Sequence, residues 1–312
     1  MSKNSNLHKA KGVKNDEFYT RLEDIEKELS NYRQHFENKI VYCNCDSVPE
    51  SQFWVYFHTH FAELRLKKLV ATHFDRHNFT DKYEYSGGDD TDISAYVATP
   101  LNSHGDFRSP QCTCIMRESD IVITNPPWSL FLQYMIYLNK YARNWLILGT
   151  QNAISYKEIF SYIQANKLWL GCNSGDMAFR VPADAEERET RFWIDEDNQK
   201  WRSLGNCCWF TNLEHANRHK PLELVCTYSA DKYPTYINHD AVNCDRYVDI
   251  PCDYDGIIGV PITYLQYHCP EQFDIVGFRK GTDNKDLYYK DGDKVVQPYF
   301  RILIQKKSSD CS

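Results

Sequence analysis

Hydrophobic and polar positions in the first half of the chain follow a repeating pattern of short apolar runs and longer amphipathic stretches. Apolar residues recur at helical spacing in some segments, whereas others are continuous, β-branched runs typical of strands buried on both faces. The predicted helices are 21–37, 53–69, 130–141 and 156–165, and the predicted strands are 40–43, 69–74, 82–85, 93–97, 120–124, 145–148 and 167–170. Strands that alternate with helices predict βαβ units and a parallel sheet, with 82–85 and 93–97 forming a hairpin.

The pattern changes after about residue 171. Residues 191–194 and 200–202 are predicted to pair around a polar turn, and 205–211 reads as a further strand. Residues 214–312 contain many tyrosines, short apolar runs and few helical patterns, which favours a mixed or β-rich second part. We therefore predict a basic arm over 1–14, an α/β catalytic domain over 15–213 and a separate C-terminal region over 214–312.

Composition narrows the class of protein. Of 312 residues, 42% are hydrophobic and 25% charged, which is typical of a globular domain and excludes a mostly disordered chain. The sequence has no uninterrupted apolar run of about 18 residues and no N-terminal signal, so we expect a cytoplasmic protein without a membrane partner. Twelve cysteines without zinc-knuckle spacing predict free thiols and no metal site. The net charge of −7 argues mildly against a nucleic-acid binder.

The sharpest chemical signal is Asn125-Pro126-Pro127-Trp128, which directly follows the predicted strand 120–124. Two prolines fix φ and remove two N–H donors, so the backbone offers carbonyl acceptors beside the amide oxygen of Asn125. Such a site can hold both hydrogens of a planar NH₂ group while Trp128 stacks on the attached ring. Methylation of a planar amino group needs this arrangement, and it needs neither a metal nor a covalent intermediate.

Acidic residues follow several other predicted strands. Ligands bind beyond the carboxyl ends of the strands of a parallel sheet, which makes these positions candidates for a binding site. They are Asp46, Asp75 and Asp106 with Phe107.

Several motifs in order resemble one known family. Besides DIVITNPPWSLF, the chain contains NDEFYT at 15–20, GDFRS at 105–109, WFTNL at 209–213 and PEQF at 270–273. Over about residues 14–280 this set resembles the EcoRI-type adenine-specific DNA methyltransferases. The resemblance implies an α/β, Rossmann-like S-adenosylmethionine-dependent methyltransferase sheet with a C-terminal mixed α+β target-recognition region. It further implies a site-specific enzyme that methylates adenine N6 in double-stranded DNA, for restriction-modification or self-protection.

The resemblance assigns roles to the catalytic motif. Asn125 and the carbonyl of Pro126 would accept hydrogen bonds from adenine N6, Pro127 would hold the backbone, and Trp128 would stack on the target base. Family members more often have Phe or Tyr at the fourth position, so the pocket around Trp128 would be wider.

It also assigns roles at the cofactor. Asp46 would contact the methionine part of S-adenosylmethionine, although the glycine-rich turn expected there is missing. Asp75 would take the ribose hydroxyls, or else be a turn or helix-cap residue. Asp106 would accept from the cofactor's adenine amine, and Phe107 would pack on that ring. The remaining residues expected to line the cofactor pocket are Phe18, Tyr19 and Thr20.

Binding DNA requires flipping the adenine out of the stack, at a cost of a few kcal/mol. Basic clusters could supply backbone contacts in spite of the net charge. The candidates are Lys9, Lys11, Lys14, Arg218 and Lys220. The acid-rich segment 184–197 is expected to face away from the DNA.

Two other functions remain open from the sequence. An amino-group methyltransferase acting on RNA or on a protein glutamine would need a similar motif, and a catalytically silent DNA-binding protein could keep the fold. If the main prediction holds, a bacterial or phage origin and a cognate restriction endonuclease sharing the target site are expected.

Overall fold

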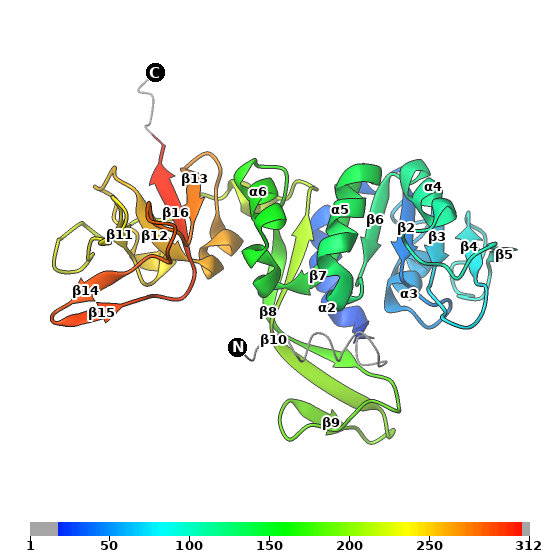
Figure 1. The fold of residues 1–312 in the computed structure, drawn as a ribbon. Helices are drawn as coiled ribbons and strands as arrows, with labels where there is room; N and C mark the ends of the chain where they lie inside the picture. The colour runs from blue at the N-terminus through cyan, green and yellow to red at the C-terminus, as the bar shows by residue number, and fades with distance from the viewer. Residues whose placement is uncertain (1–17, 308–312) are drawn as a thin grey trace. The chain divides into compact units, whose positions relative to one another are not determined.

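The computed structural model describes residues 18–307, and the chain divides into two compact units (Figure 1). The first unit comprises residues up to 156 together with 170–213, and the second comprises 157–169 together with the residues from 214 onward. The sequence placed 157–169 in the catalytic domain, whereas the structure groups this segment with the C-terminal part.

A ten-stranded mixed sheet forms the centre of the first unit, in the order β1-β8-β10-β7-β6-β2-β3-β4-β5, with β9 paired to β10. Its strands are β1 (Tyr19–Thr20), β2 (Ile40–Asn44), β3 (Lys68–Thr72), β4 (Asp81–Tyr85), β5 (Val97–Pro100), β6 (Ile121–Thr124), β7 (Asn144–Thr150), β8 (Trp169–Arg180), β9 (Phe192–Ile194) and β10 (Lys200–Thr211). The four strands β3, β2, β6 and β7 are parallel, and antiparallel strands extend the sheet on both sides. The predicted α/β, Rossmann-like fold is confirmed.

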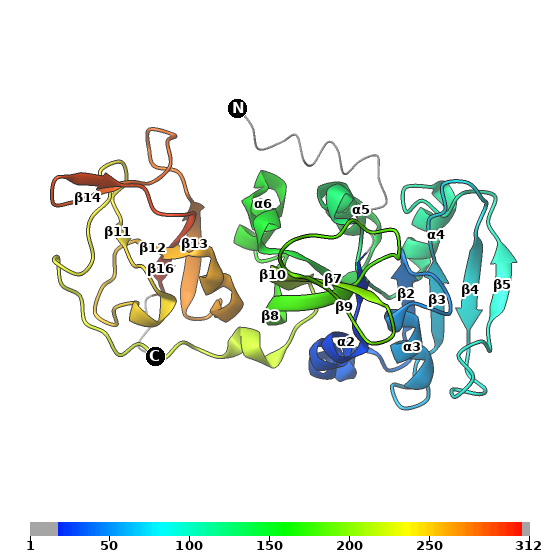
Figure 2. The ribbon, with the colours of Figure 1, turned by 90° about the horizontal axis from the view of Figure 1, so that it is seen from below.

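All four residues of β6 are buried, because this strand lies between β2 and β7 and is covered on both faces. Figure 2 shows α2 and α3 on one face of the sheet and α4 and α5 on the other. The helical segments of this unit are α2 (Leu22–Leu29), η1 (Ser30–His35), α3 (Gln52–Thr59), α4 (Pro110–Glu118), η2 (Trp128–Leu130), α5 (Phe131–Tyr141) and η3 (Gln151–Ser155). The side chains of Ser51 and Ser109 cap α3 and α4, which sets where each begins.

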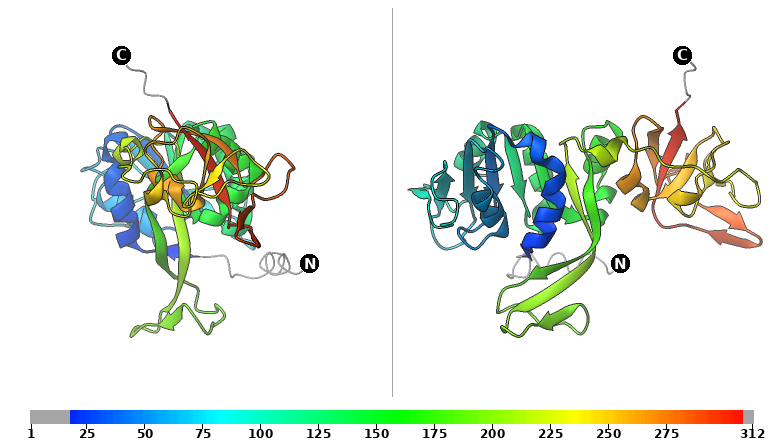
Figure 3. Two further views of the ribbon diagram at one scale, coloured as in Figure 1. Left: turned by 90° about the vertical axis from the view of Figure 1, so that its left-hand side faces the viewer. Right: turned by 180° about the vertical axis from the view of Figure 1, so that it is seen from behind.

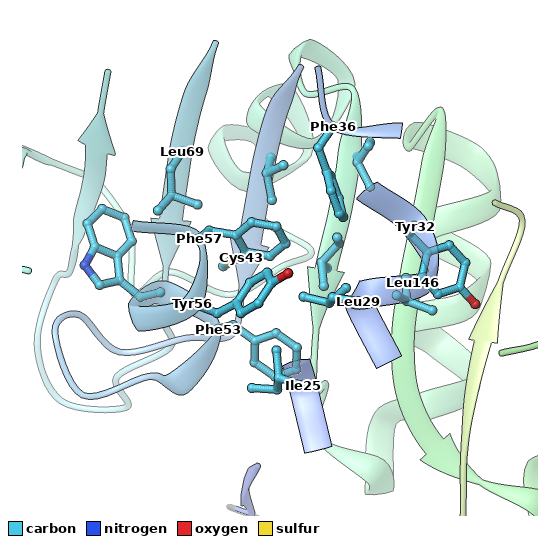
Figure 4. Packing of buried hydrophobic residues seen from close by; sticks show 14 of the residues in the cluster. Ile25, Leu29, Tyr32, Phe36, Cys43, Phe53, Tyr56, Phe57, Leu69 and Leu146 are labelled. Atoms are coloured by element: carbon cyan, nitrogen blue, oxygen red, sulfur yellow. The ribbon is translucent and has the colours of Figure 1, made fainter. Parts of the chain in front are cut away.

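The apolar stripes of α2, η1 and α3 meet the parallel strands in one large cluster (Figure 4). Ile25, Leu29 and Phe36 from the first stripe pack with Phe53 and Phe57 of α3. Burying side chains of this size contributes roughly 1.5–3 kcal/mol each, which holds the helices against the sheet and keeps the strand ends in place.

The strands β8 and β10 continue beyond the sheet as a long ribbon, with β9 at its far end (Figures 1 and 3). The predicted pairing of 191–194 with 200–202 is confirmed by the register of β9 with β10. The sequence placed a strand only at 167–170, because the polar, partly exposed residues of the ribbon hide its continuation from the apolar pattern.

Two predicted boundaries in the first unit are wrong. The helix expected over 53–69 ends at Thr59, and buried Phe61, Leu64 and Leu66 pack from a turn that follows it. The second hairpin strand begins at Val97 instead of ending there, and its four residues are exposed.

The second unit is β-rich, as predicted for residues 214–312. Its strands form a four-stranded sheet in the order β11-β12-β16-β13 and a two-stranded β14-β15 hairpin. The strands are β11 (Val242–Asn243), β12 (Ile258–Pro261), β13 (Phe273–Phe278), β14 (Tyr289–Asp291), β15 (Lys294–Val296) and β16 (Arg301–Lys306), and the helical segments are α6 (Lys157–Gln164), η4 (Ala216–His219), η5 (Tyr247–Asp249) and η6 (Ile262–Tyr267). Helix α6 packs on β13 through stacked rings of Phe160 and Phe278, 4.6 Å apart, which explains why 157–169 belongs to this unit.

Candidate active site

The candidate site lies where the connections of the parallel strands change direction, between β2 and β6. The chain passes from β2 to β3 on one side and from β6 to β7 on the other, so the loops that follow β2 and β6 diverge. Asp46 lies two residues beyond β2, and Asn125 directly follows β6. A crevice at the carboxyl ends of such strands is where α/β proteins bind their ligands.

The side-chain amide of Asn125 is held at both ends. Its Nδ2 donates to the Phe18 carbonyl at 2.7 Å and to the Thr20 hydroxyl at 3.2 Å, and its Oδ1 accepts from Trp128 Nε1 at 2.9 Å. A peptide carbonyl can only accept and an indole N–H can only donate, so these partners settle which end carries the oxygen. The oxygen keeps a second lone pair for an incoming N–H group.

Trp128 belongs to a group of three aromatic rings. Phe18 stacks on it with centroids 5.1 Å apart and an interplanar angle of 27°, and Phe179 meets both rings edge-on at 5.6 Å. Phe18 immediately precedes β1, which pairs with β8 so that Thr20 lies opposite Phe179. The structure therefore brings residues 18–20 directly to the motif.

The two prolines shape the backbone as expected. Pro127 has φ −61° and ψ 119°, and its carbonyl accepts from the Leu130 N–H at 2.9 Å, which opens the short helix η2. Pro126 is buried, and within the described residues no hydrogen bond reaches its carbonyl. That carbonyl and Asn125 Oδ1 are thus two acceptors available at the end of β6.

Asp46 is buried, at 7% exposure, and has hydroxyl partners. Ser51 Oγ donates to its Oδ1 at 2.5 Å, and Thr124 Oγ1 lies 2.6 Å from its Oδ2. Burial raises the pKa of the Asp46 carboxyl to about 7, in spite of the opposing effect of these two hydrogen bonds. Ser51 and Thr124 were not predicted as site residues, although Thr124 is the residue immediately before the motif.

Asp75 and Asp106 lie on two loops that are joined by the backbone. The Asp75 N–H donates to the His104 carbonyl at 3.0 Å. Gly105 has φ +72°, and a Cβ there would lie 1.8 Å from the His73 carbonyl oxygen, so only glycine allows this approach. The sequence had no means of showing this contact, because it joins residues about 30 positions apart.

The Asp75 carboxylate closes a turn. It accepts from the N–H groups of His77 and Asn78, at 2.7 and 3.1 Å, and from the Asn78 side chain at 3.2 Å. These hydrogen bonds lower the pKa of Asp75 to about 2. The turn role expected as the alternative for Asp75 is therefore present in the structure.

Asp106 is held by Arg108. The guanidinium Nη2 lies 2.6 Å from Oδ2, and the Arg108 N–H and Nε both reach Oδ1. Burial raises the pKa of Asp106, but these hydrogen bonds outweigh it and leave the pKa lowered. The neighbouring Phe107 is 4% exposed and packs edge-on against Tyr134 at 4.9 Å, so at most a small part of its ring can face a ligand.

Comparison with known proteins identifies the relatives of this chain. Residues 6–307 match the family model described as adenine-specific methyltransferase EcoRI. The chain belongs to this family. It is 43% identical to the type II methyltransferase M.EcoRI of Escherichia coli, with 97% of each chain covered. It is also 34% identical to M.MgeORF184P of Mycoplasma genitalium, over 86% of this chain and 85% of the other, and 32% identical to M.MpnI of Mycoplasma pneumoniae, over 86% and 84%.

Membership of the EcoRI adenine-specific methyltransferase family decides between the functions left open by the sequence. The protein is an enzyme, and its reaction is methyl transfer to adenine, as the resemblance of the ordered motifs implied. The alternatives of a protein-glutamine methyltransferase and of a catalytically silent protein are excluded.

The structure shows the surroundings of two of the basic residues that were predicted to contact DNA in this methyltransferase. Lys9, Lys11 and Lys14 lie outside the described residues. Lys220 is exposed, as a DNA contact would require.

Arg218 needs a correction. It is 7% exposed, it donates to Glu214 and Asn166, and its guanidinium carbon lies 3.7 Å from the centre of the Trp169 ring. Arg218 therefore stabilises the second unit of the methyltransferase and is not available to a phosphate. The prediction that Arg218 contacts DNA is wrong because the sequence of a basic cluster does not show which of its arginines is buried.

Within residues 18–307, no group of three or more His, Cys, Asp or Glu side chains is arranged to hold a metal ion. No helix in the same part of the methyltransferase is long and apolar enough to cross a membrane.

Proposed function

We propose that the protein transfers a methyl group from S-adenosylmethionine to N6 of an adenine that is flipped out of double-stranded DNA at a specific site. The observation that carries this proposal is the fixed orientation of Asn125, with Oδ1 toward Trp128 Nε1 and Nδ2 toward the Phe18 carbonyl. Two acceptors, Asn125 Oδ1 and the Pro126 carbonyl, match the two hydrogens of an exocyclic NH₂ group.

The catalytic contribution of these residues is positioning. Hydrogen bonds to both N6 hydrogens hold the amino group and help turn its lone pair, which is delocalised into the ring, toward the electrophile. Trp128 supplies a face on which the base stacks, and the prolines keep the carbonyl from moving. As the amino group develops positive charge, acceptors already directed at its hydrogens stabilise that charge.

The residues that follow the parallel strands fit S-adenosylmethionine, which supplies the methyl group as an electrophile when bound. Its methionine part is cationic, and the buried carboxyl of Asp46 has no cation as a hydrogen-bond partner in the described structure. Asp75 would hold the ribose, and Asp106 with an edge of Phe107 would hold the adenine ring. Phe18, Tyr19 and Thr20 would close the pocket from the side of β1.

We further propose that duplex DNA is the substrate and that the second unit reads the target sequence. The relatives carry the names of type II methyltransferases, which supports a role in restriction-modification and a cognate endonuclease that shares the target site. The catalytic elements come first along the chain, which leaves the C-terminal part for recognition of the target sequence. Lys9, Lys11, Lys14 and Lys220 are the candidate backbone contacts that remain.

The first test is the methylation itself. DNA from cells that express the protein is sequenced with a readout sensitive to N6-methyladenine. A single methylated sequence motif is expected, and it identifies the target site. Absence of N6-methyladenine, while the purified protein binds S-adenosylmethionine, would contradict the proposed function.

The second test is Asn125→Ala. Removal of one of two acceptors that act in the transition state is expected to lower methyl transfer on the order of 10²–10³-fold. Cofactor affinity, measured by calorimetry, should stay within about threefold of wild type, because the pairing of β1 with β8 still holds residues 18–20 when the Asn125 hydrogen bonds are lost. Asn139→Ala is the control, since that amide donates to the Met135 carbonyl of its own helix. Activity that survives Asn125→Ala would show that the catalytic assignment is wrong.

A further inference from the structure

A half-buried arginine of the β8–β10 ribbon lies beside the aromatic group of the active site. The guanidinium carbon of Arg202 is 5.4 Å from the centre of the Phe18 ring, and Phe18 stacks on Trp128 at 5.1 Å. Arg202 is therefore two ring contacts away from the tryptophan on which the target base is proposed to stack.

Within residues 18–307, Arg202 has no acidic partner. Among the ion pairs of the described residues, none involves Arg202 or its neighbour Arg188. Burial, followed by the positive charge of Arg188, lowers the pKa of Arg202. A cation that is taken out of water without a counter-charge destabilises the free protein, so an anion is expected to meet it in the functional complex.

Two other cations of the same ribbon are paired. Arg191 donates to Asp176 at 2.8 Å, and Lys200 lies 3.7 Å from Glu187. Among residues 18–307, Arg202 and Arg188 have no such partner, and neither does Arg180 at the end of β8, which lies over the Tyr19 ring at 4.9 Å. The guanidinium of Arg202 lies over the Phe18 ring, and its N–H groups make no hydrogen bond to the described residues, so they can bind a phosphate by two hydrogen bonds.

We propose that Arg202 and Arg188 form a phosphate-binding site for the DNA strand that carries the target adenine. This inference rests on the proposed function, because it needs a base stacked on Trp128. A phosphodiester fits better than the single carboxylate of the cofactor, since Arg188 is exposed and lies beyond the sheet on the connection between β8 and β9. The site also revises the expectation that the whole segment 184–197 faces away from DNA, because Arg188 lies within it.

The test is a double-mutant cycle between the arginine and single phosphates. A duplex carrying the methylated sequence found in expressing cells is prepared with one neutral methylphosphonate at each position within three nucleotides of the target adenine. Affinities of wild type and Arg202→Gln are measured by fluorescence anisotropy with S-adenosylhomocysteine present. Arg202→Gln is expected to weaken binding about tenfold and to reduce the salt slope by about one. At one phosphate, methylphosphonate should weaken wild type by a similar factor and leave the variant unchanged.

Arg191→Gln is the matched control, since it removes the same charge from the ribbon at a paired position, and its affinity should stay within about twofold of wild type. Arg188→Gln, at an exposed side chain, should show a smaller loss that couples to the same phosphate. The melting temperature of Arg202→Gln should equal or exceed that of wild type, because no ion pair is lost and a desolvated charge is removed.

Several results would overturn the site. Additive effects at every phosphate, or wild-type DNA affinity in Arg202→Gln, would show that no phosphate is bound there. Weaker cofactor binding with unchanged DNA affinity would assign the anion to the cofactor carboxylate. A large fall in the melting temperature of Arg202→Gln, together with an Arg188→Gln effect that does not couple to any phosphate, would show that Arg202 has a structural role. If wild type methylates DNA while any of these results holds, only the phosphate site fails, whereas absence of methylation removes the proposed function as well.

Discussion

At the scale of single residues, Thr124 connects the buried carboxyl of Asp46 to the catalytic motif that begins at the next position. Its hydroxyl approaches both the Asn44 carbonyl and Asp46 Oδ2, but it has one hydrogen to give. If Asp46 carries a proton, it can donate to Thr124 while Thr124 donates to Asn44, and every group is satisfied. Hydrogen counting therefore agrees with a pKa of about 7 for Asp46 in the free protein.

This protonation predicts how stability depends on pH. The unfolded carboxyl loses its proton near pH 4 and the folded one near pH 7, so between these values the folded state binds more protons. The free energy of unfolding therefore falls as pH rises from about 4 to 7, by at most about 4 kcal/mol from this group, and then levels off. Asp46→Asn should lose this contribution.

The measurement is urea unfolding of the cofactor-free protein at pH 4.5, 6 and 7.5. The free energy of unfolding of wild type should fall relative to that of Asp46→Asn as the pH rises across the series. The exposed Asp291→Asn serves as control and should track wild type at each pH. A constant difference between Asp46→Asn and wild type would show that the Asp46 carboxyl titrates normally.

At the scale of elements, helix α2 is fastened to strand β8 by one buried carboxylate. Glu28 is fully buried and accepts from the N–H groups of Cys172 and Asn173, each at 2.8 Å, and from the hydroxyl of Tyr32 at 2.9 Å. Burial raises the pKa of Glu28, although these hydrogen bonds oppose it. The same strand β8 pairs with β1, so this carboxylate helps to hold the strand that orients Asn125.

Glu28→Gln should destabilise the protein by about 2–4 kcal/mol, because an NH₂ group would then face N–H donors inside the core. The exposed Glu26→Gln on the same helix should change stability by less than about 0.5 kcal/mol. Both values are read from urea unfolding at pH 7. Equal stability of the two variants would mean that Glu28 does not fasten the helix.

The loops that bear Asp75 and Asp106 depend on Gly105. Gly105→Ala adds a Cβ that would lie 1.8 Å from the His73 carbonyl oxygen, in a backbone with φ +72° that itself disfavours alanine by about 1–2 kcal/mol. The two loops must separate, and cofactor affinity should fall on the order of tenfold or more. Gly292→Ala has a similar φ of +58° and open space around it, so it bears the backbone cost alone and should bind cofactor normally. Unchanged affinity in Gly105→Ala would show that the loops do not form the pocket.

At the scale of the whole molecule, a net charge of −7 must be compatible with binding DNA. Part of the acid lies at the strand ends Asp46, Asp75 and Asp106, where a cationic cofactor is proposed to bind. Another part is neutralised locally on the ribbon, as in the pair of Glu187 with Lys200. Affinity for DNA then depends on a few uncompensated cations and on the contacts made at the target site.

This balance predicts modest, salt-sensitive binding to DNA that lacks the target. Between 50 and 200 mM salt, affinity for a mixed-sequence duplex should fall about 10³–10⁵-fold if six to ten phosphates are contacted. The same duplex with the mapped target should bind more tightly at every salt concentration. Anisotropy titrations measure both, and binding to mixed-sequence DNA that does not change with salt would contradict the prediction.

The sequence alone predicted most of the first unit. Its parallel strands and the helix following Asn125 appear where the apolar runs placed them, because strands buried on both faces must be continuously apolar. It failed where the chain is polar and exposed, as along the continuation of β8 beyond residue 170, since no apolar pattern marks such a strand. It also missed α4, in which Pro110 at the first turn and a Ser109 cap were the available signals.

The local sequence alone also predicted the chemistry of the catalytic motif. Order and identity of the residues in Asn125–Trp128 point to an acceptor-rich site for an amino group, because two prolines constrain their own backbone whatever surrounds them. Only the tertiary structure decided how Asn125 is oriented and that Thr124 and Ser51 share the carboxyl of Asp46. It also decided that Arg218 is buried and that Arg202 has no counter-charge within residues 18–307. These properties depend on partners far along the chain and on exclusion from water, and neither is specified by the neighbours of a residue in the sequence.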